Sequence, residues 1–120
     1  MKTLLIEDSL VIRETLMPAM AEMANAHFLG IAETGEDAIL LLQVHSDEWS
    51  LAVVDLFLRQ GSGLDVLAAC QRRNPGQKVV VLTNYPTPAM RARCSFLGAD
   101  ALFDKSTELE EFLTFCSDLK

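Results

Sequence analysis

Five polar side chains stand where short apolar runs of the sequence end: Glu7, Asp8, Asp55, Thr83 and Lys105. If those runs are parallel strands, these side chains meet at one edge of the sheet, where ligands of open α/β folds bind. Three carboxylates in one crevice repel each other, so they must recruit positive charge or take up protons. Oxygen ligands favour Mg²⁺, and a hydroxyl and an ammonium can stabilise phosphoryl oxygens. The pattern therefore indicates a hard-metal and phosphoryl site.

The apolar runs themselves predict five strands: Thr3–Ile6, Phe28–Ala32, Leu51–Val54, Lys78–Leu82 and Ala101–Phe103. They do not alternate with polar residues, which is typical of strands that are buried on both faces. The segments between them repeat apolar residues with helical periodicity. We therefore expect an α/β fold, a flavodoxin-like doubly wound five-stranded parallel sheet of order 2-1-3-4-5 with helices on both faces. In that order, the crevice lies between the first and third strands.

Hydroxyl residues mark where helices should begin. Four of them are predicted N-caps: Thr34, Ser62, Thr87 and Thr107. The last of these forms a capping-box pattern with Glu110. Pro18 falls inside the first expected helix and predicts a kink there, because proline lacks the N–H that a helix interior uses.

Composition limits the class of protein. The 120 residues carry 10 Lys and Arg against 17 Asp and Glu, a net charge of −7, and we expect one domain over residues 1–120. An acidic chain argues against direct binding of nucleic acid, and no apolar run has the length of a membrane span or signal peptide. The cysteines, Cys70, Cys94 and Cys116, form no zinc-ligand pair. We expect them to be buried thiols in a reducing cytoplasm.

Together these features identify a resemblance that runs from residue 3 to about residue 119. The chain resembles a response-regulator receiver domain of bacterial two-component signal transduction, of the chemotaxis-regulator kind. The motifs that carry the resemblance stand in the family's order and spacing: Leu4–Ser9, Val53–Asp55, Gly63, Val81–Thr83, Gly98–Asp100 and Lys105. Each motif is weak alone, and the ordered set is specific.

The resemblance implies a role for each polar residue of the crevice. Asp55 would be the phosphoacceptor. Asp8, Asp55 and the backbone carbonyl of Phe57 would coordinate Mg²⁺, and Glu7 would hold water on the metal. Thr83 and Lys105 would each contact an oxygen of the transferred phosphoryl group.

It also implies the partners and the output. The phosphoryl group would come from a sensor histidine kinase or a histidine phosphotransfer protein. The charge it adds would switch contacts with a downstream protein or effector domain, through the surface formed by residues 87–97, 101–104 and 107–119. Such a domain is not a turnover enzyme, although it assists its own phosphorylation and dephosphorylation. It would be either a stand-alone receiver or part of a longer protein.

Several residues depart from the family pattern. Leu102 stands where the switch aromatic is usual, with Phe103 one residue later, so Leu102 is expected in the core and the usual aromatic–hydroxyl coupling is in doubt. Ser106 replaces a proline, and we expect a trans peptide bond before it. Asn84 and Phe57 flank the expected phosphoryl position, where they either hinder the water that hydrolyses the acyl phosphate or are tolerated loop variation.

Four other interpretations compete with this one. Any single acid could be a helix cap, although this explains the whole set poorly. A haloacid-dehalogenase-type phosphatase needs a second aspartate two residues after the first, where this chain has Phe57. A flavodoxin-like cofactor binder would have its phosphate repelled by Glu7 and Asp8. The last alternative keeps the receiver fold as a docking module that acts without phosphorylation.

Overall fold

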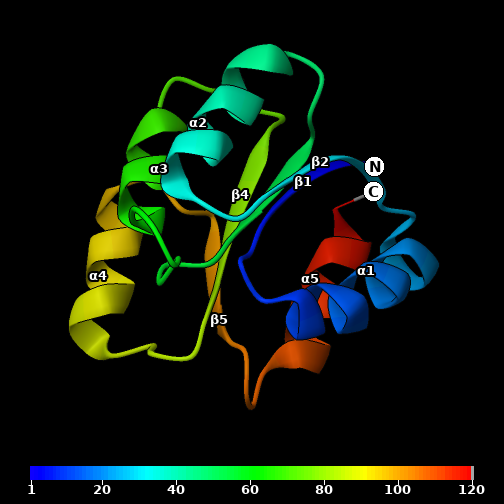
Figure 1. Cartoon of the computed structure of the whole chain (residues 1–120). Coiled ribbons are helices and arrows are strands. Elements are labelled where there is room, and N and C mark those ends of the chain that lie inside the picture. Colours follow the sequence, from blue (N-terminus) through cyan, green and yellow to red (C-terminus); the bar gives the residue numbers. More distant parts are fainter. Residues whose placement is uncertain (120) are drawn as a thin grey trace.

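A parallel sheet lies between two layers of helices in the computed structural model, which describes residues 1–119 (Figure 1). The strands are β1 (Lys2–Ile6), β2 (His27–Ala32), β3 (Leu51–Val54), β4 (Lys78–Thr83) and β5 (Ala101–Asp104). The helices are α1 (Leu10–Ala24), α2 (Gly35–Val44), α3 (Gly63–Ala69), α4 (Pro88–Phe96) and α5 (Leu109–Asp118). The last residue of the expected domain, residue 120, lies outside the described part.

The sheet has the order β2-β1-β3-β4-β5, and every neighbouring pair is parallel. This confirms the flavodoxin-like, doubly wound prediction. The observed strands end within one residue of the predicted bounds. The ladder between β4 and β5 continues one residue further than expected, because Thr83 pairs with Asp104. The apolar run stops at that point, whereas the backbone pairing does not.

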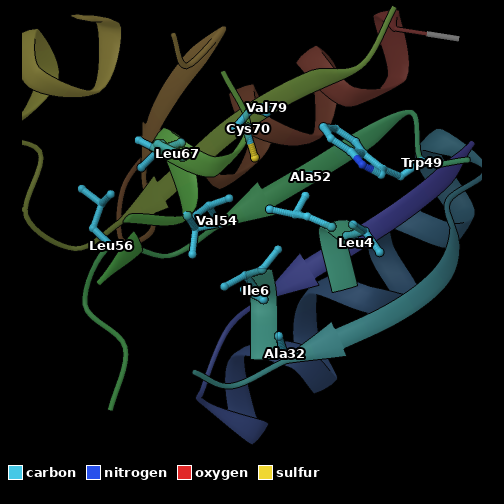
Figure 2. Close-up of a cluster of buried hydrophobic side chains, with 14 of the residues drawn as sticks. Leu4, Ile6, Ala32, Trp49, Ala52, Val54, Leu56, Leu67, Cys70 and Val79 are labelled. Atoms are coloured by element: carbon cyan, nitrogen blue, oxygen red, sulfur yellow. The ribbon is translucent and has the colours of Figure 1, made fainter. Parts of the chain in front are cut away.

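Side chains of each strand alternate between two separate cores. Leu4 and Ile6 pack toward α2, α3 and α4, whereas Leu5 between them packs toward α1 and α5. Figure 1 shows these helices on opposite faces of the sheet. Figure 2 shows the first core, with Trp49 at one end and Leu56 near the carboxyl end of β3. Because helices cover both faces, every residue of β3 is buried, which explains its unbroken apolar sequence.

Three of the four predicted N-caps are confirmed. The hydroxyl oxygens of Thr34, Ser62 and Thr87 each accept a backbone N–H of the first helical turn at 3.1 Å. Helix α1 runs from Leu10 to Ala24 through Pro18, so the proline does not end it. The kink at that position stays a prediction.

The predicted capping box at Thr107 is wrong. Glu108 takes the N-cap position of α5, and no side chain caps that helix. The Glu108 carboxylate instead accepts the backbone N–H of Asp104 at 3.0 Å, and the Glu108 N–H donates to the Asp104 carbonyl at 2.9 Å. This reciprocal pair closes the loop between β5 and α5 one residue later than the capping pattern required.

The three cysteines are buried free thiols, as expected. Burial raises the pKa of Cys70 to about 11 and that of Cys116 to about 12, and it also raises the pKa of Cys94. At neutral pH they are therefore uncharged and pack as small apolar groups. Within residues 1–119, none of the helices has the length and apolar character that crossing a bilayer requires.

Helix α3 begins unusually close to the end of β3. A Cβ atom added to Gly63 would collide with the backbone carbonyl oxygen of Asp55 and would lie 2.7 Å from the Cα atom of Leu56. The Gly63 N–H donates to the Leu56 carbonyl at 3.0 Å. A glycine at this position therefore lets α3 support the backbone of Asp55 directly.

Replacing Gly63 with alanine should destabilise the fold, because backbone atoms on both sides must move apart. We expect Gly63→Ala to lower the free energy of unfolding by about 1–3 kcal/mol, measured by urea denaturation. The matched control is Gly76→Ala, since nothing lies within 4 Å of an added Cβ there. Equal stability of the two variants would contradict this account of α3 docking.

Candidate functional site

The ends of β1 and β3 bring three carboxylates together. Asp55 follows β3 directly, and its backbone N–H donates to the carbonyl of Ile6 at 2.9 Å, which places it beside the end of β1. Glu7 and Asp8 follow β1. Each of the three acids offers an oxygen atom, and these atoms all lie within 4.8 Å of one another. The convergence expected from the sequence is therefore present.

Lys105 joins two of these acids from the other side. Its Nζ lies 2.5 Å from Oε1 of Glu7 and 3.2 Å from Oδ2 of Asp55. The Lys105 side chain is 8% exposed, and those of Glu7 and Asp55 are 2% and 7% exposed. The Lys105 backbone N–H donates to the carbonyl of Thr83 at 2.9 Å, so pairing with β4 fixes the position of the Lys105 backbone. The ammonium thus provides the charge partner that buried carboxylates require.

One lysine does not balance the site. Burial raises the pKa of Asp55, Lys105 opposes that shift, and the charge of Asp8 adds to it. Burial also raises the pKa of Glu7, against its hydrogen bond with Lys105 and with the charge of Asp55 adding to the rise. The cluster therefore carries an excess of buried negative charge, and a cation bound there would stabilise the ionised carboxylates.

Glu7 and its neighbours shape the start of α1. Oε2 of Glu7 accepts the backbone N–H of Ser9 at 3.1 Å, and Ser9 itself caps α1. Nη1 of Arg13 donates to the backbone carbonyl of Glu7 at 2.8 Å and lies 2.8 Å from Oε2 of Glu33. A capping role therefore accounts for one bond of Glu7 and not for its ion pair. Sequence reasoning missed Arg13, and no signal in the sequence could have found it, because it binds a backbone carbonyl of Glu7 in the loop before α1.

A cavity of about 340 Å³ opens over the acids. Its walls are formed by Glu7, Asp8, Ser9, Ile12, Asp55, Phe57, Asn84, Tyr85 and Lys105. Thr83 does not line this cavity. It is completely buried, and its hydroxyl oxygen accepts the backbone N–H of Tyr85 at 3.2 Å. In this conformation the Thr83 hydroxyl is engaged with its own loop.

An aromatic pair stands at the mouth of the cavity. The rings of Phe57 and Tyr85 meet edge to face with centroids 5.0 Å apart, and both side chains are more than half exposed to solvent. Sequence reasoning named Phe57 and missed Tyr85. An exposed aromatic residue two positions after Thr83, in a loop, was the signal that could have found it.

The comparisons with known proteins agree with this geometry. The family model for the response regulator receiver domain matches residues 3–116. The chain belongs to this family. A curated "Cyclic di-GMP phosphodiesterase" from Thermotoga maritima is 31% identical over 112 residues, which cover 92% of this chain and 28% of that protein. The "Acid tolerance regulatory protein ActR" of Rhizobium meliloti is 30% identical over 110 residues, which cover 92% of this chain and 55% of that protein.

Solved structures share the fold at lower identity. A DNA-binding response regulator of the LuxR family from Staphylococcus aureus superposes with a TM-score of 0.85 at 19% identity, covering 98% of this chain and 97% of that one. The Mn²⁺-bound response regulator Rcp1 gives a TM-score of 0.77 at 24% identity, covering 98% and 90%. The chain spans only about a quarter to about half of the curated relatives it matches.

In this receiver domain the two candidate switch residues of β5, Leu102 and Phe103, lie on opposite faces of the sheet. Leu102 packs against the core under α2, α3 and α4, as expected. Phe103 packs on the opposite core, where its ring centroid lies 6.0 Å from that of Phe112 and 5.7 Å from that of Phe115. Neither residue lines the acidic cavity. Because neighbouring strand residues point to opposite faces, Phe103 cannot substitute for an aromatic ring at position 102.

The loop after β5 also differs from the usual receiver pattern. The Lys105–Ser106 peptide bond is trans, as predicted. The Ser106 N–H donates to Oδ1 of Asp104 at 2.7 Å, and its hydroxyl donates to Oδ1 of Asn84 at 3.2 Å. This receiver domain therefore connects its last two strand-end loops through side chains.

The raised pKa values predict how the stability of the receiver domain depends on pH. The native state holds protons that the unfolded chain has already released, so the free energy of unfolding falls as pH rises from the ordinary carboxyl range, 3.8 for Asp55, through the raised values. Asp55→Asn cannot ionise and should be more stable than the wild type at about pH 7, with the gain shrinking toward about pH 4. Urea denaturation in chelator at several pH values measures this difference.

The control for that measurement removes a charge that is solvated. Glu14 is exposed on α1, and Glu14→Gln should change the free energy of unfolding at about pH 7 by less than Asp55→Asn does. If the free energy of unfolding of Asp55→Asn runs parallel to that of the wild type over the whole pH range, burial does not raise the pKa of Asp55.

Proposed function

We propose that this receiver domain is a phosphoacceptor module that takes a phosphoryl group onto Asp55 in a Mg²⁺-dependent reaction. The single observation that carries the proposal is the buried cluster in which Lys105 touches Asp55 and Glu7 beneath an open cavity. A carboxylate that is merely structural would need neither the third acid nor the opening. We infer that one receiver domain occupies residues 1–120.

The cluster suits a hard divalent cation. Oxygen-only donors, an excess of buried negative charge and an accessible cavity are what Mg²⁺ sites offer. We propose that Asp8, Asp55 and the backbone carbonyl of Phe57 hold the ion, and that Glu7 holds water on the metal. The bound ion would neutralise charge on the carboxylates and on the incoming phosphoryl group. The Mn²⁺ held by Rcp1, a structure of the same fold, supports a divalent ion here.

The proposed transfer is a displacement at phosphorus. An oxygen of the Asp55 carboxylate forms a bond to the phosphorus of a phosphohistidine, and the electron pair of the breaking P–N bond returns to the donor imidazole. Asp55 must be ionised to attack. Lys105 favours the ionised form, because its ammonium lies 3.2 Å from Oδ2 and opposes the effect of burial on the pKa.

After transfer, Lys105 and Thr83 would bind the new phosphoryl oxygens. Lys105 would exchange contact with a carboxylate for contact with the phosphoryl group, which adds roughly two negative charges. The Thr83 hydroxyl would leave the N–H of Tyr85 and turn toward the cavity, drawing the loop before α4 with it. That movement would alter the surface of residues 87–97, 101–104 and 107–119, where Arg91 of α4 now lies 3.3 Å from Glu108.

We infer the partners from the same chemistry. The donor would be a sensor histidine kinase or a histidine phosphotransfer protein, and the reader would be a downstream protein or an effector domain in the same chain. The net charge of −7 disfavours direct contact with nucleic acid. We propose a cytoplasmic protein that is not a turnover enzyme and that assists its own phosphorylation and dephosphorylation.

We also propose that Phe57 and Asn84 modulate the lifetime of the acyl phosphate. Both line the cavity, and the ring of Phe57 is held by Tyr85 at the mouth, where hydrolytic water must enter. Bulk at this position would slow the approach of water to phosphorus.

Incubation with a small acyl phosphate and Mg²⁺ tests the phosphoacceptor role. Intact mass should show a single phosphoryl adduct on the wild type, none on Asp55→Asn, and a loss of the adduct when a chelator removes Mg²⁺. Asp65→Asn, at an exposed aspartate of α3, should keep the adduct. A wild type without any adduct would favour a docking module that acts without phosphorylation.

Phe57→Ala tests the proposed control of lifetime and leaves the Asn84 side chain in place. Opening the mouth of the cavity should shorten the phosphoryl lifetime by about two- to tenfold, measured as decay of the intact-mass adduct after the donor is removed. Leu40→Ala on α2 removes an exposed apolar side chain elsewhere and should leave the decay unchanged. If Phe57→Ala decays at the wild-type rate, tolerated loop variation is the better explanation for this residue.

A further inference from the structure

A side-chain hydrogen bond joins the loops that follow β4 and β5, next to Thr83 and Lys105. The Ser106 hydroxyl donates to Oδ1 of Asn84 at 3.2 Å, across 22 positions of sequence. Both residues are exposed, so the bond contributes little to folding. The effect of the bond is therefore the orientation of the two side chains that form it.

Sheet pairing places the two partners side by side. Thr83 pairs with Asp104 in the β4–β5 ladder, and the Lys105 N–H donates to the Thr83 carbonyl at 2.9 Å. The next residue of each loop is then Asn84 on one side and Ser106 on the other. The Ser106 backbone N–H donates to Oδ1 of Asp104 at 2.7 Å. This bond fixes the serine backbone, and the serine hydroxyl donates to Asn84 from that position.

The bond also decides which end of the Asn84 amide is available. With Oδ1 accepting the serine hydroxyl, the Nδ2 group keeps both of its N–H donors. Within residues 1–119 no protein acceptor takes them. Asn84 lines the same cavity as Asp55 and Lys105. A neutral pair of donors thus borders a cavity that also holds the carboxylates of Glu7, Asp8 and Asp55.

We propose that the Asn84 side-chain amide binds an oxygen of the phosphoryl group on Asp55, and that Ser106 is a positioning residue that orients this amide. The inference rests on the proposed phosphoacceptor function and deepens it. A phosphoryl group offers three strong acceptor oxygens, so it can accept this bond as well as those from Lys105 and Thr83. A neutral donor adds no charge repulsion toward a divalent cation before transfer.

Size and hydrogen bonding can be separated at this position. Asn84→Leu keeps a side chain of similar length and removes both donors, whereas Asn84→Ala removes bulk as well. The probe is beryllofluoride with Mg²⁺, a tetrahedral mimic of the phosphoryl group, titrated by ¹⁹F NMR so that no turnover is needed. We expect Asn84→Leu and Asn84→Ala both to weaken beryllofluoride binding by about three- to tenfold.

Variants at Ser106 test the positioning role. Ser106→Ala should weaken beryllofluoride binding by about two- to threefold, and Ser106→Thr, which keeps the hydroxyl, should restore wild-type affinity. In an Asn84→Leu background, Ser106→Ala should have no further effect, because the amide it orients is gone. A merely structural role for the serine would produce the same loss in both backgrounds. Thermal unfolding of each variant checks that the fold is intact.

The outcomes separate this inference from the proposed function. If the wild type binds beryllofluoride, Asp55→Asn does not, and Asn84→Leu binds as tightly as the wild type, the amide role is overturned while the phosphoacceptor role stands. Equal effects of Ser106→Ala in both backgrounds overturn the positioning role. If the wild type itself fails to bind beryllofluoride with Mg²⁺, the proposed function fails and this inference falls with it.

Discussion

The contact of one buried ammonium with two buried carboxylates is the constraint on which the rest of this structure depends. Lys105 reaches Glu7 and Asp55 from a different strand end, and all three side chains are almost completely shielded from water. Buried charges are stable only when they are paired, so the loops after β1, β3 and β5 must hold a fixed arrangement. The parallel sheet provides it, because the carboxyl ends of its strands share one edge. The acid left without a lysine contact, Asp8, keeps that edge attractive to cations.

The layout of this edge could be predicted from the sequence because it follows from strand order. Unbroken apolar runs located the strands, and the residues after each run, Asp55 and Lys105 among them, then had to meet. The contacts that the sequence did not predict are made inside loops. The pairing of Tyr85 with Phe57 depends on how two loops turn after leaving the sheet, and no periodic pattern records that geometry. The misplaced cap at Thr107 has a related cause, since Glu108 closes the loop by a bond to Asp104 that competes with the capping pattern.

The side chains of β5 that could transmit a structural change from the site lie on two different faces of the sheet. Leu102 belongs to the core under α2, α3 and α4, and Phe103 belongs to the core under α1 and α5. An aromatic side chain that moves with Thr83 is therefore not available on the α4 side of β5. The described side-chain links from the segment after β4 to the loop after β5 are polar instead: Asn84 of the loop after β4 bonds Ser106, and Arg91 of α4 pairs with Glu108. Polar links between exposed loops adjust at small energetic cost, whereas a packed aromatic ring must find a new pocket when it moves.

The placement of the aromatic side chains has a practical consequence for spectroscopy. Tyr85 is the sole tyrosine of the chain and Trp49 its sole tryptophan. The ring of Tyr85 contacts that of Phe57 at the cavity mouth, whereas Trp49 is 3% exposed at one end of the core under α2, α3 and α4 (Figure 2). The phenol and the indole are thus two built-in optical labels in different surroundings. Absorbance and near-ultraviolet dichroism of the phenol follow events at the mouth, and indole emission follows the integrity of the interior, without any chemical dye.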